Sequence, residues 1–61
     1  MEYQIVEEDG VYDLAETVRA EIKSGWQPQG GVFCINIGDA TYYGQAMIKY
    51  PKMEVYNAIA N

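Results

Sequence analysis

The chain has 61 residues, with nine acidic and four basic side chains and a formal net charge of −5 at pH 7. Histidine is absent and Cys34 is the sole cysteine, which rules out an internal disulfide and disfavours a transition-metal site. So few Lys and Arg residues disfavour nucleic-acid binding, and no apolar run approaches the roughly 20 residues of a membrane-spanning helix.

The small size of the domain limits its core. A core of this size rarely supplies more than ~3–5 kcal/mol, and such domains gain stability from disulfides, metals or self-association. With the first two disfavoured, we expect self-association. The first residues, Met1 to Gln4, lack the basic and apolar stretches of a signal peptide, so we expect a cytoplasmic protein.

The first predicted elements are a strand and a helix. Residues 1–6 contain Tyr3, Ile5 and Val6, which favour a strand, and residues 7–10 break it. Residues 11–24 are predicted to form a helix whose apolar side chains fall on one side: Val11, Leu14, Ala15, Val18 and Ile22. Asp9 is the expected N-cap, and Gly25 is the expected left-handed residue that ends the helix.

A β-hairpin is predicted next, over residues 31–37 and 41–50. Gly38 and Asp39 suit a two-residue turn with glycine first. This turn fixes the register and pairs Ile35 with Tyr42, Phe33 with Gly44 and Gly31 with Ala46.

The hairpin has two faces that are both rich in apolar residues. The first carries Gly31, Phe33, Ile35, Ile37, Ala40, Tyr42, Gly44, Ala46 and Ile48. We expect the helix to cover this face, because a large Phe33 opposite a small Gly44 suits helix packing. The second carries Val32, Cys34, Asn36, Thr41, Tyr43, Gln45, Met47 and Lys49, and we expect it to be uncovered.

The predicted fold class is α+β, a β-α-β-β unit with a three-stranded sheet, one long helix on one face and a short C-terminal helix. Residues 1–50 form the domain, and residues 51–61, which begin with Pro51, form a C-terminal helical extension of it. The segment from Tyr42 to Ile48 is apolar on both faces, so we expect the last strand to be central, in the order 1-3-2.

Three segments resemble a known family. They are a leading Tyr-Gln-Ile-Val, the run Gly-Trp-Gln-Pro-Gln-Gly-Gly-Val at residues 25–32, and Tyr-Tyr-Gly-Gln-Ala-Met-Ile-Lys at residues 42–49. Together they resemble the small bacterial and phage proteins called domain of unknown function 1737. The resemblance covers about residues 1–50. It implies a β-α-β-β unit and a bacterial or infected host cell, and it implies no activity.

Several residues are candidates for binding, each with a structural alternative. Trp26 and Pro28 suit a stacking platform, although sealing the sheet edge is the favoured role of Trp26. Gly30 and Gly31 could present amides to a phosphate, but they follow a helix instead of opening one, which favours a strand irregularity. Cys34 lacks basic neighbours in sequence and is interpreted as a sheet residue. The acidic run at residues 7–9 is interpreted as a solvated turn and not as a cation site.

No catalytic constellation is present in the sequence, so we expect a non-enzymatic protein without catalytic residues, metal or cofactor. Six tyrosines in so small a chain indicate contact area for a partner or ligand. Gln45 is either a contact residue or a solvent-facing strand residue. Partner or ligand contacts are expected from Tyr43, Gln45, Met47, Trp26, Gln27, Gln29 and Arg19.

We therefore predict a homo-oligomeric binding module, a dimer or higher, that acts through a tyrosine-rich uncovered sheet face. A protein partner is possible, and neither nucleic acid nor membrane is expected. The alternative is a phage-type sponge that sequesters a small nucleotide-like signal in pockets between subunits. In that case Arg19 and Lys23 would supply positive charge and tyrosines would stack on bases.

Overall fold

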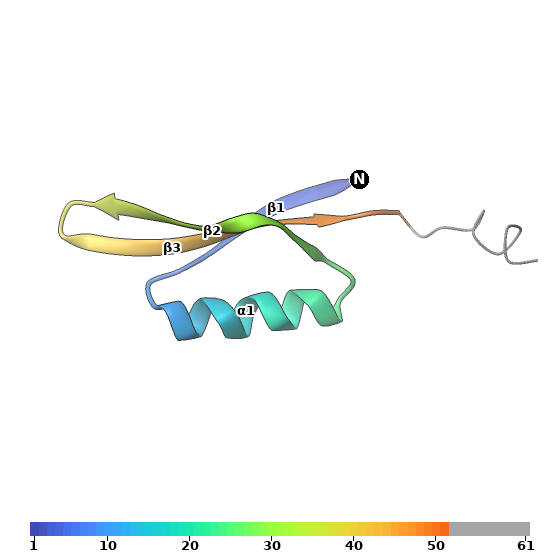
Figure 1. The fold of residues 1–61 in the computed structure, drawn as a ribbon, viewed down its shortest axis with the longest axis horizontal. Helices are drawn as coiled ribbons and strands as arrows, with labels where there is room; N and C mark the ends of the chain where they lie inside the picture. The colour runs from blue at the N-terminus through green and yellow to red at the C-terminus, as the bar shows by residue number, and fades with distance from the viewer. Residues whose placement is uncertain (52–61) are drawn as a thin grey trace, which may run out of the picture.

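The computed structural model describes residues 1–51 of the chain. Its elements are β1 (Glu2–Glu8), α1 (Val11–Lys23), β2 (Gln27–Ile37) and β3 (Ala40–Lys49). The strands form one sheet in the order β1-β3-β2, and β3 runs antiparallel to both neighbours. The α+β class, the β-α-β-β order and the central β3 are confirmed (Figure 1). The predicted C-terminal helix lies outside the described residues.

The helix α1 begins at Val11 and ends before Gly25, as the sequence predicts, but its N-cap residue differs from the prediction. Gly25 adopts a φ of +98°, and the amides of Gly25 and Trp26 donate to the carbonyls of Ile22 and Glu21, which is the Schellman arrangement. The predicted N-cap Asp9 is wrong, because extended Gly10 occupies the N-cap position with no side-chain bond to the first turn. Asp9 lies one residue before the N-cap position, too far from the helix for its carboxylate to cap the amides of the first turn.

The turn of the β2–β3 hairpin is confirmed at Gly38, whose φ is +62°, and Asp39. The predicted pairs Ile35–Tyr42 and Phe33–Gly44 are also confirmed. The predicted pair Gly31–Ala46 is wrong, because Ala46 pairs with Gln29. Between these points a bulge places Gly30, Gly31 and Val32 opposite the single residue Gln45. The positive φ of Gly30, +74°, permits this detour of β2.

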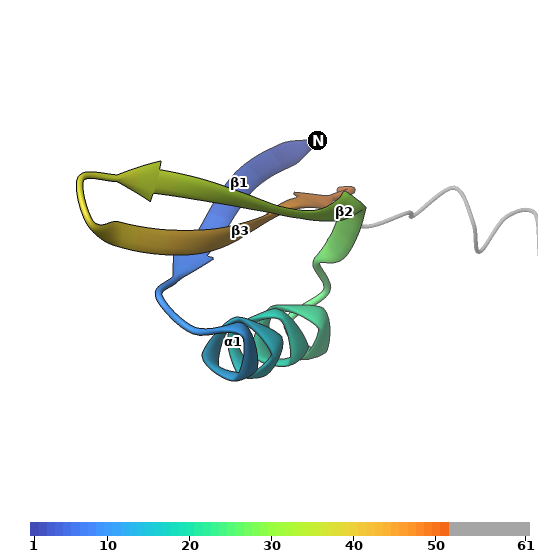
Figure 2. The same ribbon diagram turned by 60° about the vertical axis from the view of Figure 1, so that its left-hand side comes forward.

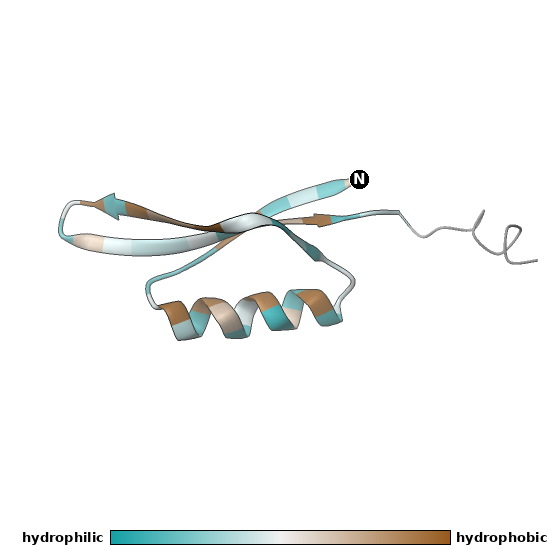
Figure 3. Cartoon of the chain, in the orientation of Figure 1, coloured by the Kyte–Doolittle hydropathy of each residue, from teal (hydrophilic) through white to brown (hydrophobic). Residues whose placement is uncertain are grey.

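The helix lies on one side of the sheet, as Figures 1 and 2 show. It covers the face that carries Tyr43, Gln45 and Met47, so the predicted uncovered face is in fact the covered one. The core is Val6, Leu14 and Met47, with Val18, Trp26 and Tyr43 packed against it. Apolar residues recur in α1, β2 and β3 (Figure 3), so both hairpin faces offered a site for the helix.

Contacts from β1 fix the helix on this face. The Gln4 side-chain amide donates to the Glu21 carboxylate at 3.0 Å, and the Thr17 hydroxyl donates to Glu8 at 2.8 Å. Because side chains alternate along a strand, Gln4, Val6 and Glu8 share one side of β1. These even-numbered residues face α1, which leaves Tyr3 and Ile5 on the opposite side of the sheet.

Candidate functional site

The candidate site is the side of the sheet opposite α1. Strand register and alternation place nine apolar or aromatic residues there. We call them the uncovered face: Tyr3, Ile5, Phe33, Ile35, Ile37, Ala40, Tyr42, Ala46 and Ile48. Tyr3 and Ile37 are each 61% exposed and Ile5 is 52% exposed. Isolated exposed apolar residues are ordinary, whereas a group contributed by all three strands is a candidate interaction surface.

Within the uncovered face, the central strand supplies the most enclosed residues. Ala46 and Ile48 are 9% and 7% exposed. Ala46 lies between Ile5 and Gln29 of the neighbouring strands, and Ile48 lies between Tyr3 and Gln27. The surface therefore has a packed centre along β3 and more exposed side chains along β1 and β2.

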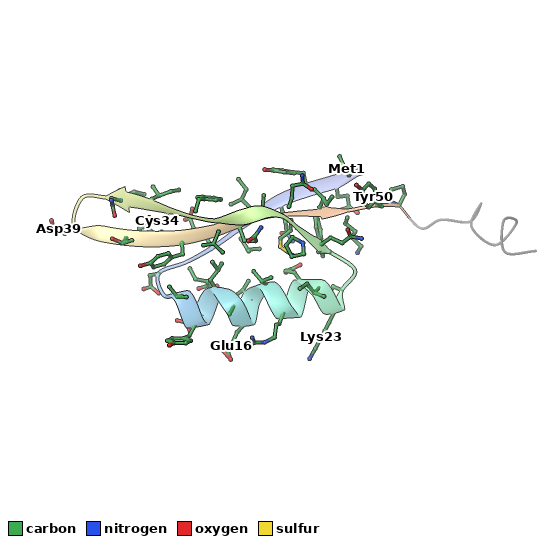
Figure 4. The ribbon with its side chains drawn as sticks, in the orientation of Figure 1. Met1, Glu16, Lys23, Cys34, Asp39 and Tyr50 are labelled. Carbon is green, nitrogen blue, oxygen red and sulfur yellow. The ribbon has the colours of Figure 1, made fainter. Side chains whose placement is uncertain are left out.

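Charge is unevenly distributed between the two sides of the molecule. On the side of the uncovered face, Glu7 is the one charged residue that the strand registers place there. Glu16 and Lys23, by contrast, project from α1 away from the sheet (Figure 4). Burial of the uncovered face would thus desolvate few charges, which favours contact with another apolar surface.

A close contact shapes the middle of the uncovered face. The ring of Phe33 lies across Gly44, which is buried and has no side chain of its own. The aromatic ring replaces the missing side chain and covers the backbone of the central strand. The large-against-small match that the sequence indicates is therefore real, but it lies on the side away from the helix.

Three of the sequence-predicted contact residues lie beneath α1. Met47 is fully buried, and Tyr43 is half-buried against the core. Trp26 is also half-buried against the core, and the ammonium of Lys49 lies 5.7 Å from its ring centroid. Met47 therefore has no surface to offer a partner, and Tyr43 and Trp26 offer only part of theirs.

Gln45 is buried, with 4% of its surface exposed, so the solvent-facing interpretation is wrong. Its side-chain amide donates to the carbonyls of Gln29 at 3.2 Å, Gly30 at 3.1 Å and Ala46 at 3.0 Å. The first two carbonyls belong to the start of the bulge, where the regular pairing with β3 is interrupted. Gln45 thus holds the bulge against the central strand.

The remaining predicted contact residues are exposed but dispersed. Gln27 and Gln29 extend from β2 on the side of the uncovered face, whereas Arg19 belongs to α1 on the other side of the sheet. The structure therefore does not bring the predicted set together in one site.

The apolar pattern of the β2–β3 hairpin did not identify which face is uncovered, because apolar residues alternate on both of its faces. The sequence signal for the covered face lay in β1, where Gln4 and Glu8 are the polar residues that face α1.

A groove opens between α1 and the bulge of β2. Its volume is about 330 Å³, at the small end of the range for ligand pockets. The lining is largely aliphatic and comprises Val11, Leu14, Ala15, Val18, Arg19, Val32 and Gln45. It offers one cationic side chain and one amide.

We compared the chain with models of protein families, with curated proteins and with solved structures, and none of them matches it. The resemblance to the domain of unknown function 1737 therefore stays a prediction. In the part of the chain that the structure describes, no three Cys, Asp or Glu side chains gather as metal ligands. The helix between Val11 and Lys23 is neither long nor apolar enough to cross a membrane.

Proposed function

We propose that the domain is a non-enzymatic, self-associating interaction module whose contact surface is the uncovered face. The observation that carries the proposal is the exposure of Tyr3, Ile5 and Ile37 beside a packed apolar centre. Among residues 1–51, the helix lies on one side only and leaves the three-stranded sheet without a second layer. A second sheet stacked on this side would supply that layer, as in β-sandwiches.

A second copy of the chain is the partner that the charge distribution favours. Each copy has a formal charge of −5, so two copies repel one another wherever their charged sides approach. Stacking through the uncovered faces brings together the sides with the fewest charges and keeps the helices outermost. A two-fold axis that relates the copies is the commonest arrangement for such an isologous contact.

The size of the surface predicts a modest affinity. A face of three strands, with a spacing of about 4.8 Å and a rise of about 3.3 Å per residue, presents roughly 400 Å² of plan area per copy. Two copies would thus bury an area near the lower limit for specific interfaces, which is about 1,000 Å² in total. We therefore expect an association that depends visibly on concentration.

Sequestration of a nucleotide-like ligand is the second candidate. Its support is the groove that includes Arg19 in its lining. One cation and one amide in an otherwise aliphatic lining make a weak site for phosphate groups, and the acidic chain repels anions. Self-association through the uncovered face is therefore preferred.

Sedimentation from about 10 µM to about 1 mM tests the proposal, because this range brackets a weak complex. The variant Ile5→Lys places a charge in the uncovered face, and Ala20→Lys makes the same change of charge at an exposed position of α1. We expect the wild type and Ala20→Lys to associate as the concentration rises and Ile5→Lys to remain monomeric. A wild type that stays monomeric at the highest concentration would contradict the proposal, as would association of Ile5→Lys equal to that of the wild type.

Native mass spectrometry of the protein purified from producing cells separates the two candidates. A mass equal to two or more copies of the chain, with nothing else bound, supports self-association alone. A small molecule retained by the wild type and lost in Arg19→Ala would instead favour sequestration.

A further inference from the structure

The outer edge of β2 is a second surface, separate from the uncovered face. Because β3 is central, β2 lies at the end of the sheet. The hairpin turn determines which backbone groups of β2 point outward. In a two-residue turn the flanking residues, Ile37 and Ala40, form a hydrogen-bonded pair, and such pairs alternate along an antiparallel ladder. The N–H and C=O groups of Cys34 and Asn36 therefore point away from β3.

The two edges of the sheet differ in how they discourage pairing. The seven residues of β1 include Glu2, Glu7 and Glu8, and charged side chains are a common means of blocking an edge strand. The first half of β2 contains Pro28 and the bulge, which have the same effect. The last five residues, 33–37, contain no charge, no proline and no irregularity of register. Within the part of the chain that the structure describes, no strand pairs with the outer side of this segment, so it is an open edge.

We propose that residues 33–37 of β2 pair antiparallel with the same segment of a second copy, about a two-fold axis at Ile35. The outward backbone groups of Cys34 in one copy then bond those of Asn36 in the other, and the reverse. On the side of the uncovered face Ile35 meets its counterpart, and Phe33 meets Ile37 of the second copy. Each of these cross-strand pairs is apolar and stabilises such a ladder.

The polar side chain at this edge does not oppose the pairing. The Asn36 side chain accepts a hydrogen bond from the Thr41 hydroxyl at 2.8 Å within its own hairpin. The Cys34 side chain is exposed and uncharged. Pairing at the edge joins two sheets side by side and makes their uncovered faces continuous. It goes beyond the proposed function, which concerns contact through the face itself.

Amide hydrogen exchange followed by NMR tests the edge directly. We expect the Cys34 and Asn36 amides to exchange at least about tenfold more slowly at a concentration where the protein associates than in dilute solution, because pairing supplies them with acceptors. The Ile35 amide, which points toward β3, is the internal reference and should be protected at both concentrations. Fast exchange of both outward amides in the associated protein would overturn the edge pairing and leave contact through the face intact. Protection that does not change with concentration would also overturn it, because the edge would then be covered within one chain.

The variant Asn36→Pro provides an independent test. It removes one outward N–H and no bond to β3, so the hairpin is expected to be retained. Asn36→Ala is the matched control, since it also loses the acceptor for Thr41 but keeps the N–H. We expect Asn36→Pro to lose concentration-dependent protection of Cys34 while Asn36→Ala keeps it, with both variants folded by far-UV circular dichroism. Equal protection of Cys34 in the two variants would overturn the proposal. Ile5→Lys tests the uncovered face separately, because Ile5 belongs to β1 at the opposite edge.

Discussion

The ring of Phe33 occupies the space that a side chain at position 44 would need. A Cβ atom placed on Gly44 would lie 2.5 Å from Cζ and 2.7 Å from Cε1 of that ring. The backbone conformation does not require glycine here, because the φ of Gly44 is not positive. Glycine is required because the Phe33 ring of the neighbouring strand leaves no room for a side chain. The ring and the glycine behave as one packing unit.

The variant Gly44→Ala should therefore be destabilised by about 1–3 kcal/mol, the range for overpacked sites, because the Phe33 ring must move. Gly31→Ala is the matched control, since a Cβ there meets nothing within 4 Å, and its change in unfolding free energy should be small. Urea denaturation measures both. In the Phe33→Ala background Gly44→Ala should cost much less, and an equal cost in both backgrounds would contradict the contact.

The amide of Gln45 should be needed to hold the bulge. The variant Gln45→Met keeps the length of the side chain but leaves the carbonyls of Gln29 and Gly30 without this donor. Loss of such partners costs about 1–3 kcal/mol. Gln27→Met, the same change at an exposed position of β2, should leave the urea midpoint nearly unchanged. Equal midpoints for the two variants would show that the bulge does not depend on Gln45.

Lys49 should contribute modestly through its position over Trp26. Cation–π contacts at partly exposed sites contribute about 0.5–1 kcal/mol, so Lys49→Met should lower the unfolding free energy by that amount. Lys23→Met makes the same change of charge on the far side of α1 and serves as the control. Trp26 is the sole tryptophan, so its fluorescence reports unfolding directly. A Lys49→Met variant as stable as Lys23→Met would count against the contact.

The bond from Thr17 to Glu8 should couple α1 to β1. A double-mutant cycle with Thr17→Val and Glu8→Met, which removes the acceptor, should yield a coupling of about 0.5–1.5 kcal/mol, since the bond is short and part-buried. The cycle of Thr41→Val with Asn36→Ala examines a bond of equal length, 2.8 Å, that is exposed. We expect a smaller coupling there, because water competes for both groups. The opposite order would refute the importance of burial for this pair.

Local signals made α1 and the hairpin predictable. The spacing of apolar residues in α1 and the glycines at positions 25 and 38 specify where these elements turn or end, and both glycines have positive φ. The central position of β3 followed from apolar residues on both of its faces, and residues 44–48 are indeed all buried. These properties depend on neighbours in sequence or on one strand alone.

The side of the sheet that α1 covers depends on contacts between distant segments. The bulge adds two residues, and an even number leaves the alternation of side chains unchanged, so the grouping of residues into two faces was right. The choice between those groups was wrong because Phe33 and Gly44 pack equally well against one another without a helix above them. The bonds from Gln4 and Glu8 to α1 settle the choice, and they become visible only in three dimensions.

The separation of charge from apolar surface makes this domain an amphiphile on the scale of a whole molecule. One side carries the helix with its ionised side chains, and the other presents isoleucine and aromatic rings with a single carboxylate among them. A particle of this kind orients at any boundary between water and a less polar phase. It should therefore bind hydrophobic chromatography media with its strands toward the matrix and its helix toward the buffer. Rising salt should strengthen that adsorption, since salt screens the acidic side and increases the cost of hydrating the other.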